Sequence, residues 1–266
     1  MSDPPAEPGA EGMVERIVQL NVDGAIANVA LNDPDHRNAL GIAMFDALDE
    51  ALGAIKANDD VHVVLIHGRG KVFCAGFDLA AAVEDATLMG TFIQRLSVLI
   101  RSLRRLPQVV VAAVHGAAIA GGCALVSACD LVVVSATAKL GYPVHRIGVS
   151  PAVTIPTLQQ AIGPGATRTL LMSDELIDAP TAYRVGLASR LSRDDKSVLD
   201  DAMTLCETIA RHGPHALRTT KAWLNELDGS LDDELFEHPA ESSAQIATLD
   251  EARTMLDAYW QDRPRI

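Results

Sequence analysis

The stretch GAAIAGGCALVSACD, residues 116–130, decides how the chain is organised. It places two adjacent glycines, Gly121 and Gly122, inside an apolar run that follows the strand-like segment VVVAAVHG at 109–116. We predict that the glycines open a buried helix, whose first N–H groups lack partners within the helix and lie at the positive end of its dipole. The stretch therefore predicts a strand-to-helix turn with free backbone donors.

A second glycine turn precedes this one along the chain. The segment KVFCAGFDL at 71–79 follows the strand-like VHVVLIHG at 61–68. Gly76 allows the backbone to turn sharply there, which leaves the N–H of Phe77 unpaired. We expect the N–H of Phe77 and the first N–H groups of the helix opened by Gly121 and Gly122 to face one cavity, as an oxyanion hole for a carbonyl oxygen that becomes an enolate or tetrahedral oxyanion.

The pattern around these turns is that of an α/β protein. A chain of 266 residues with 48% hydrophobic residues can bury one sizeable core. Strands are predicted at 15–22, 25–32, 61–68, 109–116 and 130–135, and helices at 42–57, 88–106 and after Gly121. From about residue 151 the strand signal stops, and helices are predicted at 151–162, 165–172, 179–186, 196–212 and 214–227, followed by more to the end.

Charge and composition exclude several classes of protein. A formal net charge of −13 disfavours nucleic acid and anionic membrane surfaces as partners. The longest apolar run is too short to span a bilayer, and residues 1–12 indicate a disordered lead and not a signal peptide, so we expect a cytoplasmic protein. The four cysteines lack metal-ligand spacing, and no metal site is expected: Cys74, Cys123, Cys129 and Cys206.

Two further segments resemble known functional motifs but lack a residue that each motif requires. GRGK at 68–71 lacks the Ser or Thr of a phosphate loop and does not complete a dinucleotide fingerprint. GVSPA at 148–152 is a near miss to a nucleophile elbow, because Ala152 replaces the second glycine. We favour Ser150 as a helix N-cap, and a serine hydrolase using Ser150 and His145 is kept as an alternative.

The two glycine motifs in this order, one after each strand, resemble those of the enoyl-CoA hydratase/isomerase family, also called the crotonase family. The resemblance extends over residues 14–263 and includes the segments DPDHRNAL, LGYPVHRIGVSP, RVGLASR, PHALRTTK and ESSAQIATLDEA. It implies a spiral of ββα units at 13–200 that carries an acyl-CoA site. It also implies a helical segment at 201–266 that assembles a homotrimer or a dimer of trimers.

The resemblance also implies roles for individual residues. The amides of Phe77 and Gly121 correspond to the family's oxyanion hole. Arg37 lies at the expected entrance for CoA, and the backbone of Cys74 and Ala75 at the adenine site. In some relatives an aromatic residue and a lysine from the C-terminus of a neighbouring subunit complete the site; Tyr259 matches the aromatic, and Arg263 lies one residue beyond the lysine position. A CoA thioester as substrate or ligand, with no cofactor, is implied.

The chain departs from the family at the two hydratase glutamates. Their positions are occupied by Ala124 and Val144, and neither side chain can exchange a proton. Hydration needs one group to activate water and one to deliver the α-proton, so we predict an acyl-CoA protein that is not an efficient hydratase. Asp78, Tyr142 and His145 are the candidate substitutes for the glutamates. Other enolate or thioester chemistry, or acyl-CoA binding without catalysis, are the alternatives.

Overall fold

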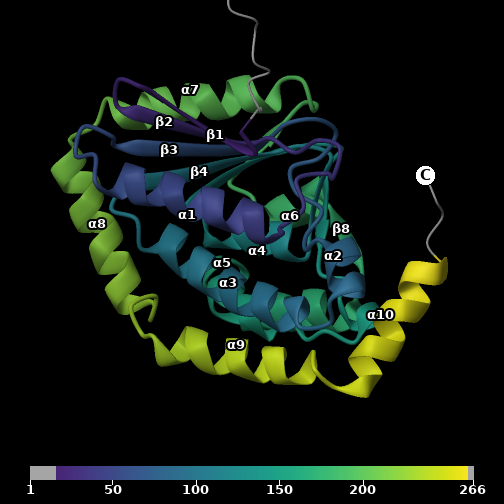
Figure 1. Ribbon diagram of the computed structural model, residues 1–266. Coiled ribbons are helices and arrows are strands. Elements are labelled where there is room, and N and C mark those ends of the chain that lie inside the picture. The colour runs from purple at the N-terminus through teal and green to yellow at the C-terminus, as the bar shows by residue number, and fades with distance from the viewer. Residues whose placement is uncertain (1–15, 263–266) are drawn as a thin grey trace, which may run out of the picture.

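A computed structural model describes residues 16–262 and shows a six-stranded sheet with helices on both faces (Figure 1). The strand order is β1-β2-β3-β4-β6-β9, in which β1 pairs antiparallel with β2 and every other neighbouring pair is parallel. The strands are β1 Val18–Asp23, β2 Ile26–Leu31, β3 Val63–Gly68, β4 Val109–Val114, β6 Leu131–Ser135 and β9 Arg190–Ser192.

The parallel strands are buried because helices cover both faces of the sheet. Every residue of β3, VVLIHG, is buried, which agrees with the continuous apolar run expected of a parallel strand covered on both sides. In Figure 1, α7 (Val198–Ala210) lies above the sheet, and α1 (Ile42–Lys56) and α3 (Leu88–Arg104) lie below it. The main core is therefore between the sheet and the α1–α3 side, with a smaller one under α7.

A second, three-stranded sheet lies beside the first and carries the glycine turn at 121–122. Its order is β5-β7-β8, with β5 (Ala117–Ile119) parallel to β7 (Lys139–Gly141) and β8 (Leu176–Asp178) antiparallel to β7. Helix α4 (Gly121–Ala128) begins two residues after β5 and is buried along its whole length. The predicted helix after the glycine pair is confirmed.

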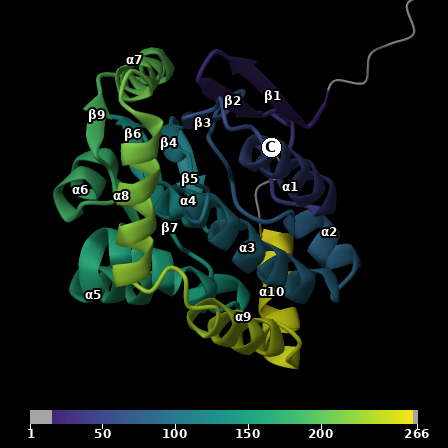
Figure 2. The same ribbon diagram turned by 90° about the vertical axis from the view of Figure 1, so that its left-hand side faces the viewer.

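The remaining elements connect the sheets and form the C-terminal part. They are α2 Leu79–Glu84, the 3-10 turns η1 His145–Ile147 and η2 Pro151–Thr154, α5 Ile155–Ser173, α6 Ala179–Val185, α8 Pro214–Leu227, α9 Glu234–Ile246 and α10 Asp250–Asp262. Figures 1 and 2 show α8, α9 and α10 following one another around the outside of the sheet-containing body.

The five predicted strands and the predicted helices up to residue 227 are confirmed, with small shifts at their ends. The prediction that strands stop at about residue 151 was wrong, because β8 and β9 follow that point. These strands, like β5 and β7, have three residues each, which is too short for an alternating pattern to stand out. Gly163, with φ 74°, interrupts α5 where a break was predicted.

A buried ion pair fixes α8 to the sheet. Lys221 Nζ donates to Asp130 Oδ2 at 2.6 Å and to the carbonyl of Gln108 at 2.8 Å. Burial lowers the pKa of Lys221, and the neighbouring Asp130 opposes that shift. Asp130 also accepts from the N–H of Val110 at 2.7 Å, so one carboxylate joins α8 to the start of β4. Removing one partner of such a pair would leave a buried charge uncompensated.

Several predictions fall on parts of the chain that these elements do not test. The predicted lead at 1–12 and Arg263 lie outside the described residues. The division at 200 into core and oligomerisation segment stays a prediction. Within residues 16–262, no helix is both long and apolar enough to cross a membrane, and no cluster of potential metal ligands is found.

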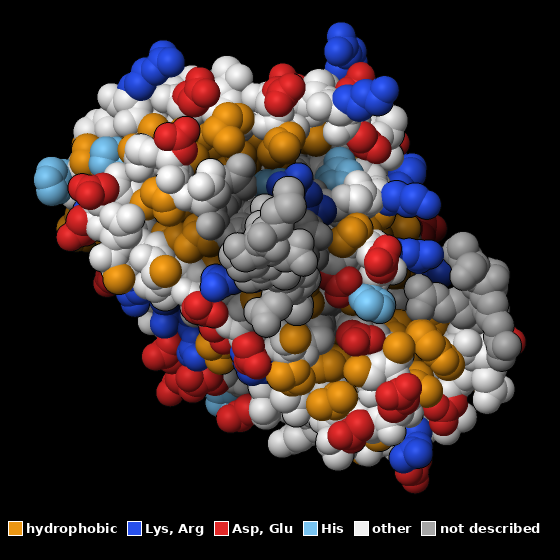
Figure 3. All heavy atoms as spheres, turned by 45° about the horizontal axis from the view of Figure 1, so that its top comes forward, with side chains coloured by type: hydrophobic (Ala, Val, Ile, Leu, Met, Phe, Trp, Pro, Cys, Tyr) orange, Lys and Arg blue, Asp and Glu red, His pale blue; other side chains and the backbone are white. Residues whose placement is uncertain are grey.

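Figure 3 shows acidic and basic side chains interspersed with hydrophobic ones on one face of the molecule.

The segment around Cys74 approaches the start of α4 so closely that only glycine fits there. The N–H of Cys74 donates to the carbonyl of Ala117 at 3.2 Å, and the N–H of Ile119 donates to the carbonyl of Cys74 at 3.0 Å. A Cβ on Gly122 would lie 2.4 Å from the carbonyl oxygen of Cys74. Because backbone atoms form this contact, no side-chain rotation can relieve it.

We predict that Gly122→Ala destabilises the protein by about 1–3 kcal/mol, the usual cost of overpacking a filled interior. Gly53→Ala is the control, because Gly53 lies inside α1 with no atom within 4 Å of a Cβ placed there. That change should stabilise the protein by about 0.5–1 kcal/mol. Urea denaturation of both variants measures the two effects, and equal stability of Gly122→Ala and the native protein would contradict the close approach.

Candidate active site

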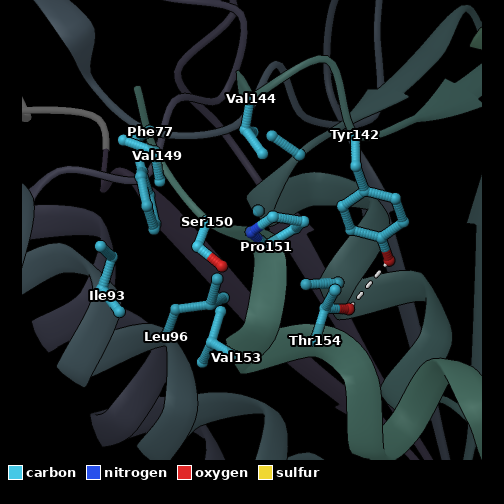
Figure 4. A pocket seen from close by; sticks show the side chains of 13 residues that line it. Phe77, Ile93, Leu96, Tyr142, Val144, Val149, Ser150, Pro151, Val153 and Thr154 are labelled. Carbon is cyan, nitrogen blue, oxygen red and sulfur yellow. Dashed lines mark hydrogen bonds between the residues drawn. The ribbon is translucent and has the colours of Figure 1, made fainter. Parts of the chain in front are cut away.

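A small, half-open pocket lies at the beginning of α4 (Figure 4). We call it the inner pocket. It is formed by α3, α4, η2 and the segments at 77 and 142–150, and most of its wall is apolar. Its lining residues are Phe77, Ile93, Leu96, Ala120, Gly121, Ala124, Tyr142, Val144, Val149, Ser150, Pro151, Val153 and Thr154.

A larger cleft, the outer cleft, adjoins the inner pocket and shares four of its lining residues, Phe77, Ala120, Val144 and Val149. Its volume is about 1140 Å³, and it carries charged groups that the inner pocket lacks. The polar and aromatic residues on it are Asp35, His36, Arg37, Asp78, Tyr259 and Trp260. A small apolar chamber therefore opens beside a long, partly charged cleft.

The two predicted amide donors lie where the chamber and the cleft meet. Gly76 and Asp78 pair with Leu40: Leu40 N–H donates to the Gly76 carbonyl at 2.7 Å, and Asp78 N–H donates to the Leu40 carbonyl at 3.3 Å. These two hydrogen bonds use the residues on either side of Phe77, and neither uses the N–H of Phe77. Gly121 is the first residue of α4, and a Cβ on Gly76 would lie 3.6 Å from its nitrogen, so the two turns are neighbours. Among the hydrogen bonds of residues 16–262, none has the N–H of Phe77 or Gly121 as donor.

The residues at the two glutamate positions, Ala124 and Val144, both line the inner pocket. Among the described residues that line it, none carries a carboxylate, an imidazole or a cation. Its polar side chains are the hydroxyls of Tyr142, Ser150 and Thr154. The pocket thus has no side chain that exchanges a proton readily at neutral pH.

Tyr142 is fully buried, and its hydroxyl lies 3.0 Å from Thr154 Oγ1 (Figure 4). Burial raises the pKa of the Tyr142 phenol well above its ordinary value, because the phenolate would lose its hydration. Cys123, beneath the pocket wall, is also buried, and burial raises the pKa of its thiol to about 12. Both groups are therefore neutral at physiological pH.

The other two candidate acid–base residues lie away from the inner pocket. Asp78 accepts a hydrogen bond from the N–H of Ala81 at 3.1 Å and caps α2, and it lies on the outer cleft. His145 is on η1, where its side chain is 42% exposed and its Nδ1 lies 3.9 Å from Asp174 Oδ1. Neither described cavity wall that contains Val144 includes His145. The neighbouring residues Val144 and His145 point to different surroundings.

Ser150 and His145 are not brought together as a catalytic pair. The Ser150 hydroxyl accepts from the N–H of Ala152 at 3.3 Å, which caps η2 as the sequence predicted. Among the hydrogen bonds of the described residues, none joins Ser150 to His145. The geometry offers no support for the serine hydrolase alternative.

The residues expected to hold CoA lie at or near the outer cleft. Arg37, Ala75 and Tyr259 line it, whereas Cys74 is buried beneath it with its N–H and carbonyl both paired to β5. Tyr259 reaches the cleft from α10 of its own chain, while a neighbouring subunit had been the expected source.

Sequence reasoning missed three residues of the cleft, Asp35, His36 and Trp260. His36 was within reach of prediction, because it precedes Arg37 in a motif already singled out. Its Nδ1 lies 2.8 Å from Asp33 Oδ1, and that hydrogen bond raises the pKa of His36. Asp35 gave no signal, because single acidic residues are usually exposed, and Trp260 gave none, because a lone aromatic residue in a helical segment usually packs into the core.

Comparison with known proteins is consistent along the whole described chain. Residues 21–261 match the family model described as "Enoyl-CoA hydratase/isomerase". A Thermus thermophilus protein that carries the provisional name enoyl-CoA hydratase is 37% identical over 247 residues, covering 91% of this chain and 96% of the relative. The crotonyl-CoA hydratase of Syntrophomonas wolfei is 30% identical over 213 residues, covering 78% of this chain and 80% of the relative.

Solved structures agree with these sequence matches. An enoyl-CoA hydratase from Mycobacterium avium is 29% identical, with a TM-score of 0.81 and coverage of 94% of this chain and 98% of that one. Pseudomonas aeruginosa OdaA is 26% identical, with a TM-score of 0.81 and coverage of 94% and 100%. The predicted crotonase-like α/β fold with C-terminal helices is confirmed. The chain belongs to the enoyl-CoA hydratase/isomerase family.

Proposed function

We propose that this protein binds an acyl-CoA thioester with its acyl group in the inner pocket and its CoA portion along the outer cleft. The thioester oxygen accepts hydrogen bonds from the N–H groups of Phe77 and Gly121. The adjacency of these two turns, where the pocket opens into the cleft, supports this placement. Family membership supports the ligand class, because enoyl-CoA hydratases act on CoA thioesters.

The charged and aromatic groups of the outer cleft suit the two ends of the CoA portion. Arg37 supplies a permanent cation for phosphate groups, and the raised pKa of His36 favours a second cation beside it. Tyr259 supplies an aromatic face on which an adenine ring can stack. Ala75 lines the same cleft and its N–H donates to the carbonyl of Arg37 at 3.0 Å, whereas the N–H and carbonyl of Cys74 are both paired with β5.

The absence of an acid or base among the described lining of the inner pocket is the observation that argues against efficient hydration. Each missing proton-transfer group typically costs about 10²–10⁴ in rate. We propose instead a reaction in which the substrate itself supplies the electrons of the enolate. In a decarboxylation, the bond between the α-carbon and the carboxyl carbon breaks, CO₂ leaves, the electron pair forms the enolate, and water returns a proton to the α-carbon.

Acyl-CoA binding without turnover is the second candidate, and the same absence favours it. Mass spectrometry of a mixed panel of saturated, unsaturated, malonyl and 3-oxoacyl thioesters in D₂O, with a protein-free control, distinguishes the two. Loss of CO₂, or uptake of deuterium at the α-carbon, identifies an enzyme and its reaction class. Thioesters that return unchanged but remain bound through desalting identify a binding protein. Thioesters that neither react nor bind would overturn the proposal.

An exposed apolar face of α8 and the loop that follows supports assembly into a homotrimer or a dimer of trimers. Trp223, Leu224 and Leu227 are 63%, 58% and 80% exposed, and Leu231 and Leu235 continue the surface toward α9. Exposed apolar surfaces of this extent are typical of subunit contacts.

Restoring the two carboxylates should restore hydration. We expect Ala124→Glu combined with Val144→Glu to raise hydration of a but-2-enoyl-CoA by about 10²-fold or more, because both positions line the inner pocket. Absorbance of the conjugated thioester measures the rate, and the corresponding double glutamine variant is the control for a change of shape. A folded double variant that binds the thioester but gains no hydration would contradict the assignment of these positions.

Charging the apolar face of α8 should dissociate the assembly. We expect Leu224→Asp combined with Leu227→Asp to reduce the mass in solution to that of one 28.2 kDa chain. Val22→Asp, the same change at a residue of β1 that is 44% exposed, is the control and should leave the mass unchanged. Analytical ultracentrifugation gives the masses. A native protein that already sediments as a single chain would exclude the proposed assembly.

A further inference from the structure

The three hydroxyl groups of the inner pocket differ in whether they have a proton left to donate. Tyr142, Ser150 and Thr154 are the polar side chains among its described lining. In an otherwise apolar chamber, a hydroxyl with a free proton selects a ligand that can accept it, because a bound acyl group displaces water and a donor left without an acceptor is then costly. The partners of each hydroxyl therefore bear on the acyl group that fits.

Tyr142 and Thr154 belong to a buried chain of hydroxyls that satisfies itself. The Tyr142 hydroxyl lies 3.0 Å from Thr154 Oγ1, which lies 3.5 Å from Ser127 Oγ. Ser127 Oγ donates to the carbonyl of Ala124 at 2.9 Å. Tyr142 can thus donate a hydrogen bond to Thr154, Thr154 to Ser127, and Ser127 to the carbonyl of Ala124, so that each donor has an acceptor. Neither Tyr142 nor Thr154 needs a ligand.

Ser150 is in a different position. Its oxygen accepts a hydrogen bond from the N–H of Ala152 at 3.3 Å, which uses a lone pair of the oxygen. The hydroxyl proton is not used in that hydrogen bond and can be donated to a ligand. Among the hydrogen bonds of residues 16–262, none has the Ser150 hydroxyl as donor. Figure 4 shows Ser150 apart from the Tyr142–Thr154 pair, with the apolar side chains of Leu96 and Val153 nearby.

The chemistry of the wall also limits what can accept this proton. No cation is among the described residues that line the inner pocket. A carboxylate there would lose its hydration without gaining a counter-ion, which raises its free energy and favours its loss as CO₂ over its retention as a bound hydrogen-bond acceptor. A ketone or hydroxyl oxygen carries no such penalty. The small size of the inner pocket favours a short acyl group.

We propose that Ser150 is a specificity-determining residue that donates a hydrogen bond to a neutral oxygen on a short acyl chain. The substrate class is then short acyl-CoA thioesters with a ketone or hydroxyl group, such as 3-oxoacyl and 3-hydroxyacyl thioesters, in preference to plain hydrocarbon chains. This inference rests on the proposed binding of acyl-CoA at this site. It gives Ser150 a role other than that of a nucleophile, and it requires no base.

Calorimetric titration of the full chain with butyryl-CoA, 3-oxobutyryl-CoA, 3-hydroxybutyryl-CoA and malonyl-CoA tests the inference. These ligands have acyl groups of similar size and differ in the oxygen that they carry. We expect 3-oxobutyryl-CoA or 3-hydroxybutyryl-CoA to bind about tenfold more tightly than butyryl-CoA, the effect of one neutral hydrogen bond. We expect malonyl-CoA to gain no such advantage.

Substitution of Ser150 separates its hydroxyl from its size. Ser150→Ala should reduce the tenfold preference to less than about twofold while leaving the affinity for butyryl-CoA within about twofold. Ser150→Thr keeps the hydroxyl and should retain the preference. Since Ser150 also caps η2, thermal melting and the butyryl-CoA affinity verify that each variant is folded.

The outcomes distinguish this inference from the function on which it depends. If the native protein binds none of the four thioesters, the proposed function fails. If it binds butyryl-CoA as tightly as the oxygenated ligands, or if a folded Ser150→Ala variant keeps the full preference, acyl-CoA binding stands and the role of Ser150 is overturned. Should Ser150→Ala not fold, the preference of the native protein and of Ser150→Thr decides the matter.

Discussion

The backbone of Cys74 pairs with β5 at a distance that leaves no room for a side chain at Gly122, and the rest of the site depends on this contact. It holds the turn at Gly76 against the beginning of α4 and so places the amides of Phe77 and Gly121 beside one another. The turn at Gly76 comes after β3 of the main sheet, and the turn at Gly121 follows β5, the short strand that comes directly after β4; β3 and β4 are parallel neighbours, so both segments leave the main sheet at the same edge. The sheet thus sets the distance between two donors that are far apart in sequence.

The proposed site offers two backbone amides to an acyl thioester, and the described lining of the inner pocket contains no side chain that would move protons. Backbone amides need no particular side chain, so they persist whatever residues occupy Ala124 and Val144. The apolar lining of the inner pocket, which includes Ala124 and Val144, lowers the local dielectric constant and strengthens any hydrogen bond formed inside it. A pocket of this kind favours ligands that bring their own reactivity, and it makes the free proton of Ser150 more selective than it would be in a wetter site.

The sequence predicted long, strongly patterned elements well and short ones badly. The buried strands β3 and β4 and the helix at Gly121 followed from apolar runs and glycine placement, because many residues share the same signal. Three-residue strands such as β8 and β9 carry no such pattern: β9 forms against the edge of the longer β6, and β8 against the equally short β7. In the site, the cap formed by Ser150 was predictable from local sequence. The hydroxyl chain from Tyr142 to Ser127 was not, because it joins residues from α4, the segment after β7 and η2.

The most direct test of the central claim is a crystal structure of the protein with butyryl-CoA bound. The account predicts the thioester oxygen about 2.7–3.1 Å from the nitrogens of both Phe77 and Gly121, with the acyl chain in the inner pocket. A thioester oxygen that contacts only solvent, or an acyl chain outside the pocket lined by Ala124 and Val144, would contradict it.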